Sequence, residues 1–220
     1  MIYRAQPIKG LLRSEEYFSS LKEAEAIKGL WNQFFLLTVI SLVISTLSGY
    51  WGLGTESISK TLPSVSVNMF EWEKMYFTTG QAVWGVLYPF VILFIPSLLY
   101  WTFLEVNFQK AAVLQASILF IFLLEKLIIL PLGLLFGMDQ MSSPFSLGVA
   151  AQYLTSNELV IRFFSSLSLF HLWAFLLQYK VLKELSTKRR KSIFIFLLIL
   201  AIVYCFFSSL FPSIQLDRLM

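Results

Sequence analysis

The chain has little of what a metal centre or an enzyme active site requires. Of its 220 residues, one is cysteine (Cys205) and one is histidine (His171). A single cysteine cannot form an internal disulfide, and a single histidine excludes the two-histidine zinc motifs. The sequence contains neither a GxSxG nucleophile elbow nor a glycine-rich phosphate loop. We therefore predict a protein that is not an enzyme, with no catalytic, metal-binding or cofactor-binding residues.

Charged residues are also scarce, and the hydrophobic residues form long runs. Charged side chains make up 14% of the sequence and hydrophobic ones 57%, whereas soluble proteins are about 25% charged. A run of about 20 apolar residues can cross a bilayer as a helix, which satisfies its own backbone polar groups. This predicts an all-α membrane protein, a bundle of five transmembrane helices. The predicted spans are 31–53, 81–104, 111–136, 159–180 and 192–211.

The basic residues are sorted by loop, and this predicts the orientation of the chain. Twelve Lys and Arg lie in residues 1–30 and in the turns at 105–110 and 180–191, against three in the segments on the opposite side. Because Lys and Arg are retained on the cytoplasmic side, we place the N-terminus in the cytosol and the C-terminus outside. In the alternative, 111–136 is a re-entrant pair broken at Pro131.

The predicted membrane domain, 31–211, therefore lies between a cytosolic lead, 1–30, and a short external tail, 212–220. Within the lead, 14–30 is predicted to be a short amphipathic helix with Tyr17, Phe18 and Leu21 near one face. This helix lies in the membrane interface, contacts a partner or serves as an elbow into the first span.

The longest external loop, 54–80, contains an aromatic and acidic stretch at 69–77. Because Trp and Tyr favour the lipid–water interface, we predict a short helix lying on the outer leaflet. A contact with a partner is the alternative.

Polar side chains within the spans are the candidates for a functional site: Glu125, Lys126, Arg162 and His171. A charge in hydrocarbon costs about 2.5–3.5 kcal/mol on insertion scales, so each needs a partner or a path to water. Adjacent helical residues do not face each other. We therefore expect Arg162 to pair with Glu125, and Lys126 to extend toward the outer surface. Such a pair either locks the third and fourth spans or serves transport or ligand binding. For His171 we expect a hydrogen bond between helices.

A basic turn precedes the last span and consists of Lys188, Arg189, Arg190 and Lys191. The net charge of +4 is sorted by loop rather than spread over a surface. This pattern favours the lipid bilayer, with its anionic surface, as a partner and argues against nucleic acid.

The second predicted span contains a pattern of aromatic residues and prolines, and the fourth contains a run of aromatic residues. The second span contains Tyr88-Pro89, then Ile95-Pro96 and Tyr100, and the fourth ends in FHLWAFLL at 170–177. With the basic turn that follows, this layout resembles the Yip (Rab-interacting) domain family over most of residues 7–211. The resemblance implies a five-span membrane protein. It supplies no catalytic residues.

Eukaryotic members of that family bind small GTPases and act in vesicle traffic, and some bacterial members are associated with ABC-type exporters and defence against antimicrobial peptides. The long cytosolic tail of the eukaryotic branch is absent here, which favours a bacterial plasma-membrane member. We thus expect a non-enzymatic, multi-pass protein that assembles with other membrane proteins, as an accessory subunit of an ABC-type exporter or toxin-resistance system. The alternatives are a small transporter or channel that uses the intramembrane charges, and a membrane-shaping or lipid-handling protein.

Overall fold

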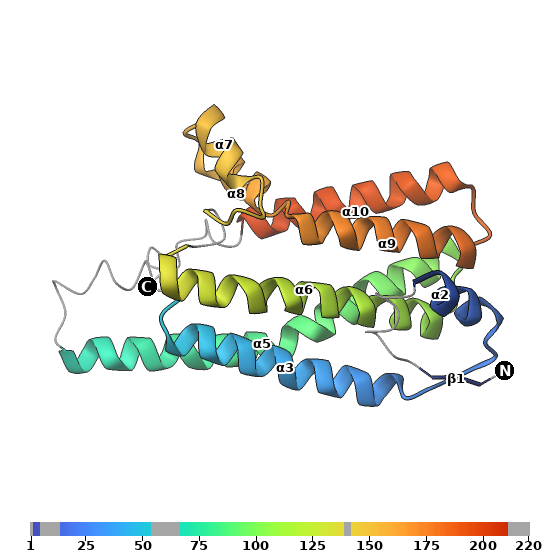
Figure 1. Ribbon diagram of the computed structural model, residues 1–220, viewed down its shortest axis with the longest axis horizontal. Coiled ribbons are helices and arrows are strands. Elements are labelled where there is room, and N and C mark those ends of the chain that lie inside the picture. Colours follow the sequence, from blue (N-terminus) through green and yellow to red (C-terminus); the bar gives the residue numbers. More distant parts are fainter. Residues whose placement is uncertain (1, 5–13, 54–66, 139–141, 211–220) are drawn as a thin grey trace.

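The computed structural model describes residues 2–4, 14–53, 67–138 and 142–210, and most of these residues are helical (Figure 1). They form eight helices and two strands of three residues each. The strands, β1 (Ile2–Arg4) and β2 (Ala26–Lys28), make one short parallel pair. The predicted helical fold class is therefore confirmed, with this strand pair as an addition that the sequence did not indicate.

Four helices are long and apolar enough to cross a bilayer. They are α3 (Leu30–Tyr50), α5 (Val67–Leu104), α6 (Phe108–Phe136) and α10 (Arg190–Leu210). Several hydroxyl groups inside them are satisfied within their own helix, since Thr38, Thr46 and Thr102 each donate to the carbonyl four residues earlier. Four such helices support a multi-pass membrane protein, and they correspond to the first, second, third and fifth predicted spans.

The fourth predicted span, 159–180, is not one helix. It is divided between α8 (Glu158–Ser165) and α9 (Leu169–Leu185), and α8 is preceded by a further short helix, α7 (Gly148–Leu154). At 17 residues, α9 rises only about 26 Å, which is less than the hydrocarbon thickness of about 30 Å.

Serine hydroxyls explain where this helix breaks. At the end of α8, Ser165 and Ser166 donate to the Arg162 carbonyl at 2.8 and 3.1 Å. At the start of α9, Ser168 is the N-cap, and its Oγ accepts from the backbone N–H of His171 at 3.2 Å. Short hydroxyl side chains compete with the backbone for helical hydrogen bonds and stabilise ends instead.

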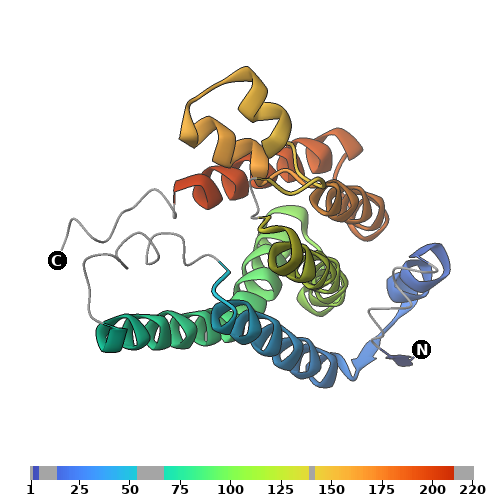
Figure 2. The ribbon, with the colours of Figure 1, turned by 60° about the vertical axis from the view of Figure 1, so that its left-hand side comes forward.

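The second span is longer than predicted. Helix α5 is continuous over 38 residues, about 57 Å, so 67–80 is not loop and 69–77 is not a separate helix. Residues 54–66 lie outside the described residues, as does the predicted tail at 212–220. Pro89 and Pro96 lie inside α5, which bends along its length (Figure 2).

Small residues allow α3 and α5 to approach closely. Ser41, Ser45 and Gly49 recur every four residues on α3 and are all buried. Across the contact lies Gly85, where a Cβ atom would be 2.9 Å from the Ser45 Cβ and 3.0 Å from the Leu42 Cα. Any larger residue at Gly85 would therefore push the two helices apart.

The helix in the lead is shorter than predicted. Helix α2 (Ser14–Glu23) ends before β2, so the prediction of helix is wrong for residues 24–29. Pairing of β2 with β1 supplies backbone hydrogen bonds that a continued helix would have made internally. Phe18 and Leu21 are buried in the same apolar core as the long helices, and α2 contacts α9.

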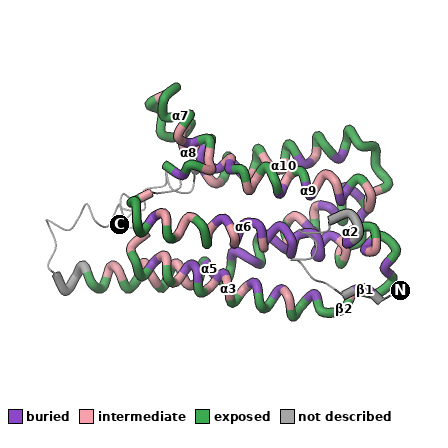
Figure 3. Tube along the Cα trace, viewed as in Figure 1, coloured by how far each residue is buried: buried purple, intermediate pink, exposed green. Residues whose placement is uncertain are grey.

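Helix α6 lies in the middle of the bundle, with α3 and α5 on one side and α9 and α10 on the other (Figure 2). Residues 111–119 of α6 are all buried, and buried positions are frequent along this helix (Figure 3). In contrast, α10 packs mainly on α9 and α8. The core is thus continuous through α6.

Candidate functional site

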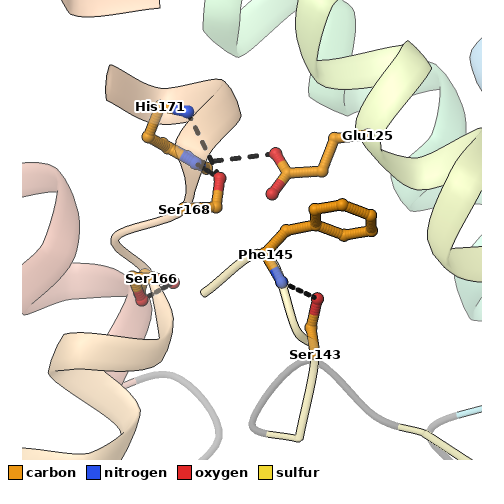
Figure 4. Close-up of polar contacts among 7 residues, drawn as sticks. Glu125, Ser143, Phe145, Ser166, Ser168 and His171 are labelled. Carbon is orange, nitrogen blue, oxygen red and sulfur yellow. Dashed lines mark hydrogen bonds and ion pairs between the residues drawn. The ribbon is translucent and has the colours of Figure 1, made fainter. Parts of the chain in front are cut away.

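The predicted site residue Glu125 lies on α6 and is buried beside the start of α9 (Figure 4). Its Oε2 atom is 3.5 Å from His171 Nδ1, and the same nitrogen is 2.8 Å from Ser168 Oγ. We call these three residues the Glu125 cluster. Because Ser168 lies in the break between α8 and α9, the break brings polar groups to the α6–α9 contact.

The two ring nitrogens of His171 have different surroundings. Nδ1 lies 2.8 Å from Ser168 Oγ, a hydroxyl that can donate or accept, and 3.5 Å from Glu125 Oε2. Nε2 is buried without a hydrogen-bond partner in the described part of the chain. The ring lies near Phe122 and Tyr204, at centroid distances of 4.7 and 5.3 Å. The ring thus hydrogen-bonds within its own helix start and faces Glu125 of α6, while one of its nitrogens has no partner among the described residues.

Lys126 has a different neighbour from Glu125, as adjacent helical positions require. Its Nζ lies 3.7 Å from the centroid of the Tyr88 ring on α5, a cation–π contact. The side chain thus rests on an aromatic ring instead of extending to the outer surface. Glu125 links α6 to α9, and Lys126 links α6 to α5.

The predicted pairing of Glu125 with Arg162 is wrong. The Arg162 guanidinium lies 3.6 Å from the carboxylate of Glu158, one turn earlier in the same helix α8. Because the helix is interrupted between α8 and α9, α8 diverges from the axis of α9 and from α6 (Figure 1). Glu125 lies at the contact of α6 with α9, and Lys126 lies at the contact of α6 with α5. Arg162 lies at neither contact.

A second polar cluster joins the turn after α5 to the turn after α9. Ser186 Oγ donates to the Leu104 carbonyl at 2.7 Å, and Thr187 Oγ1 donates to Glu105 Oε2 at 3.0 Å. Lys188 Nζ donates to Glu105 Oε1, and this hydrogen bond is the main reason that the pKa of the Glu105 carboxyl is lowered. We call this group the Glu105 clasp.

The Glu105 clasp lies at the same end of the bundle as α2 and the strand pair, the described part of the lead (Figure 1). Lys110 Nζ donates to the carbonyl of Lys22 in α2 at 2.6 Å, so the lead is attached to the start of α6. Beyond the clasp, Arg189, Arg190 and Lys191 are exposed. We call the lead, the Glu105 clasp and residues 188–191 the charged end.

No family model matches the chain, and no curated protein or solved structure matches it either. The resemblance to the Yip domain family therefore stays a prediction. Within the described residues, no group of three or more His, Cys, Asp and Glu side chains could hold a metal ion.

Sequence reasoning did not identify three partners in these contacts, namely Ser168, Tyr88 and Glu105. For Ser168 a signal existed, because the serines at 165, 166 and 168 are close together in an otherwise apolar run. Such a group indicates a helix end as readily as close helix packing. Tyr88 and Glu105 become partners only through contacts between distant segments.

Proposed function

We propose that the protein is a non-enzymatic membrane protein that assembles with other membrane proteins, as the accessory subunit of an ABC-type exporter or toxin-resistance system. The charged end carries this proposal. There, Arg189, Arg190 and Lys191 are exposed directly beside the Glu105 clasp, which holds the turn in place. An ordered basic surface suits an acidic surface on a cytosolic domain, because complementary charge steers association and defines register. The exporter itself is inferred from the family resemblance.

We further propose five spans in a bacterial plasma membrane, with the N-terminus in the cytosol and the C-terminus outside. The beginning of α3 and the two turns of the Glu105 clasp lie at one end of the bundle, which supports this topology (Figure 1). The fourth crossing would then consist of α9 together with α8 or a locally thinner bilayer. A reporter fused after Met220 should be external, and a cytoplasmic reporter would overturn the topology.

Co-purification after extraction in mild detergent tests the assembly. The protein should carry an ATPase and a permease with it, identified by mass spectrometry. Arg190→Glu should reduce their recovery about tenfold, equivalent to about 1.4 kcal/mol of binding. Lys74→Glu is the control, since Lys74 lies near the start of α5 and over the ring of Tyr50 at the end of α3, and should leave recovery unchanged.

Two results would reject the assembly. One is a chain that runs alone after every extraction, and the other is equal loss of partner in both variants. The reporter after Met220 must give the same signal in Arg190→Glu as in the parent protein, so that a change of topology is not mistaken for loss of binding.

The alternative, a small transporter or channel, is favoured by one observation. The helix is interrupted at residues 166–168, where the buried Glu125 cluster lies. Transporters build binding sites at interrupted helices of this kind. Substitution of Glu125 and Arg162 by Gln discriminates between the two functions. If both variants leave flux and phenotype intact while stability falls, the charges are structural. A membrane-shaping role for the lead has less support, because Phe18 and Leu21 already pack against the bundle.

A further inference from the structure

A polar crevice of about 390 Å³ lies between the last turn of α3 and the first turns of α5 (Figure 1). Its floor is where the two helices touch, since a Cβ atom at Gly49 would lie 3.1 Å from the Thr78 Cα. Helix α3 ends one residue later, at Tyr50, whereas α5 begins as early as Val67. The start of α5 therefore extends past the end of α3 and leaves one side of the crevice open.

Two opposite charges line this crevice, Glu71 and Lys74, both from α5. They are the only formal charges among the described lining residues. Neither forms an ion pair with another described residue, and the Lys74 Nζ atom instead lies 5.6 Å from the centroid of the Tyr50 ring. Both charges are therefore available to a ligand, and the complementary ligand carries one anionic and one cationic group.

The threonine hydroxyls in the lining are already used as donors. Thr46, Thr78 and Thr79 each donate to the carbonyl four residues earlier in their own helix. A hydroxyl has one hydrogen to donate, so these groups offer only acceptors to the crevice. Lys74 is therefore the charged donor for the anionic group of a ligand.

The depth of the crevice indicates that this ligand is a lipid headgroup. The candidate span Leu30–Tyr50 ends at the crevice, and its 21 residues rise about 31 Å, which is the thickness of the hydrocarbon. Aromatic side chains, which favour the lipid–water interface, are exposed around this level, namely Tyr50, Trp51, Trp72 and Tyr76.

The order of the two charges along α5 matches a zwitterionic phospholipid. Lys74 lies about 4.5 Å farther along the helix toward the membrane interior than Glu71, because three residues separate them. In a phospholipid the phosphate is bonded to the glycerol and the cationic group lies beyond it. A lipid with its phosphate at Lys74 would thus direct its cation toward Glu71.

The chemistry of the lining selects a primary ammonium over a quaternary one. A carboxylate only accepts hydrogen bonds. A primary ammonium has three N–H donors to offer to Glu71, whereas a choline group has none and is instead recognised by aromatic faces. The only aromatic ring among the described lining residues belongs to Tyr50, and Lys74 already lies over it.

We propose that this crevice binds the headgroup of phosphatidylethanolamine. The phosphate accepts from Lys74 Nζ, the ammonium donates to the Glu71 carboxylate, and the acyl chains continue past Ala82 along α5. The volume of the crevice lies within the range of about 300–1,000 Å³ that is typical of small-molecule sites. Because Glu105 follows the other end of α5, this site is separate from the charged end and independent of the proposed assembly.

Native mass spectrometry of the full chain tests the site. The protein is released from detergent that contains equal amounts of dioleoyl phosphatidylethanolamine and dioleoyl phosphatidylcholine. The parent should retain phosphatidylethanolamine about tenfold better, as expected for one hydrogen bond to a charged group. Glu71→Gln should abolish this preference, and Lys74→Gln should reduce retention of both lipids about tenfold.

Glu73→Gln is the matched control, because it makes the same change two residues from Glu71 and Glu73 does not line the crevice. It should retain lipid like the parent. Both lipids carry no net charge, so the basic residues of the charged end do not bias the comparison. Thermal unfolding in detergent should be the same for Glu71→Gln as for the parent, since Glu71 is exposed.

Three results would overturn the proposal. The first is equal retention of the two lipids by the parent, and the second is an unchanged preference in Glu71→Gln. The third is loss of the preference in Glu73→Gln as well, which would mean a diffuse effect of surface charge. Glycerophosphoethanolamine, the soluble headgroup without acyl chains, should not displace the lipid at equal concentration. Displacement would indicate a site for free phosphoesters and would overturn the assignment to a lipid.

Discussion

The two halves of the bundle on either side of α6 pack differently. Between α3 and α5, small residues let the backbones approach until no room remains for a Cβ atom at Gly85. Between α6 and the α9–α10 pair, the contact includes the polar Glu125 cluster, and a cavity of about 530 Å³ remains. Hydrophobicity alone therefore does not determine packing within the membrane, where lipid and side chains are equally apolar. The placement of small and polar residues does.

The sharpest test of this difference is to add volume to the close-packed half. Gly85→Leu should reduce the free energy of unfolding by about 1–3 kcal/mol or more, since the new side chain would meet the Leu42 and Ser45 backbone and Cβ atoms. Thermal unfolding in detergent measures this. Ala201→Trp should reduce the free energy of unfolding by less, because Ala201 lines the cavity and the added volume has space there.

Gly80→Ala is the control for Gly85→Leu, because both glycines lie on α5 and nothing lies within 4 Å of a Cβ atom at Gly80. It should leave stability unchanged or raise it by up to about 1 kcal/mol through helix propensity. If Gly85→Leu were as stable as Gly80→Ala, close packing of α3 on α5 would be refuted.

The next effect concerns the polar contact that replaces close packing in the other half. A double-mutant cycle of Glu125→Gln and His171→Phe should give a coupling of about 0.6 kcal/mol, with an upper limit near 1.7. The equivalent cycle of Glu125→Gln with Arg162→Gln should give none, because Arg162 pairs with Glu158. Unfolding in detergent provides both values, and a larger coupling to Arg162 would contradict the observed pairing.

The smallest expected effect is at the Glu105 clasp. Because Lys188 lowers the pKa of Glu105 in the folded state, the clasp stabilises the protein above the unfolded-state pKa. This contribution is lost as the pH falls through the lower folded-state value. The effect is small, since both side chains are exposed. Unfolding of Glu105→Gln between pH 7 and pH 3 should lack this component, and an unchanged pH profile would show that the clasp does not contribute.

Sequence patterns predicted the long apolar helices well, because a run of apolar residues is a local property. The spans matching α3, α6 and α10 differ from the observed helices by only a few residues at most ends. The fourth span failed because the average hydropathy of 159–180 concealed the capping serines at 165–168. The start of α5 was placed too late because 67–80 contains charges, which are compatible with a helix that continues beyond the bilayer.

For the candidate site, the sequence identified Glu125, Lys126 and His171 as unusual but could not assign their partners. An isolated charge in an apolar run is visible in the sequence, whereas a partner depends on how helices rotate and where they break. Arg162 was the nearest opposite charge along the predicted span, and the break in that span directed it to Glu158 instead.

The sequence by itself determined that this chain belongs in a bilayer and that its long segments are helices, because length and hydrophobicity decide both through backbone hydrogen bonding in lipid. Only the tertiary structure decided that α3 and α5 close on small residues, that Glu125 meets His171, and that a cavity stays open beside α10. These outcomes depend on side chains from separate helices meeting in space, and the physical reason is that packing and pairing energies are defined only when both partners are in place.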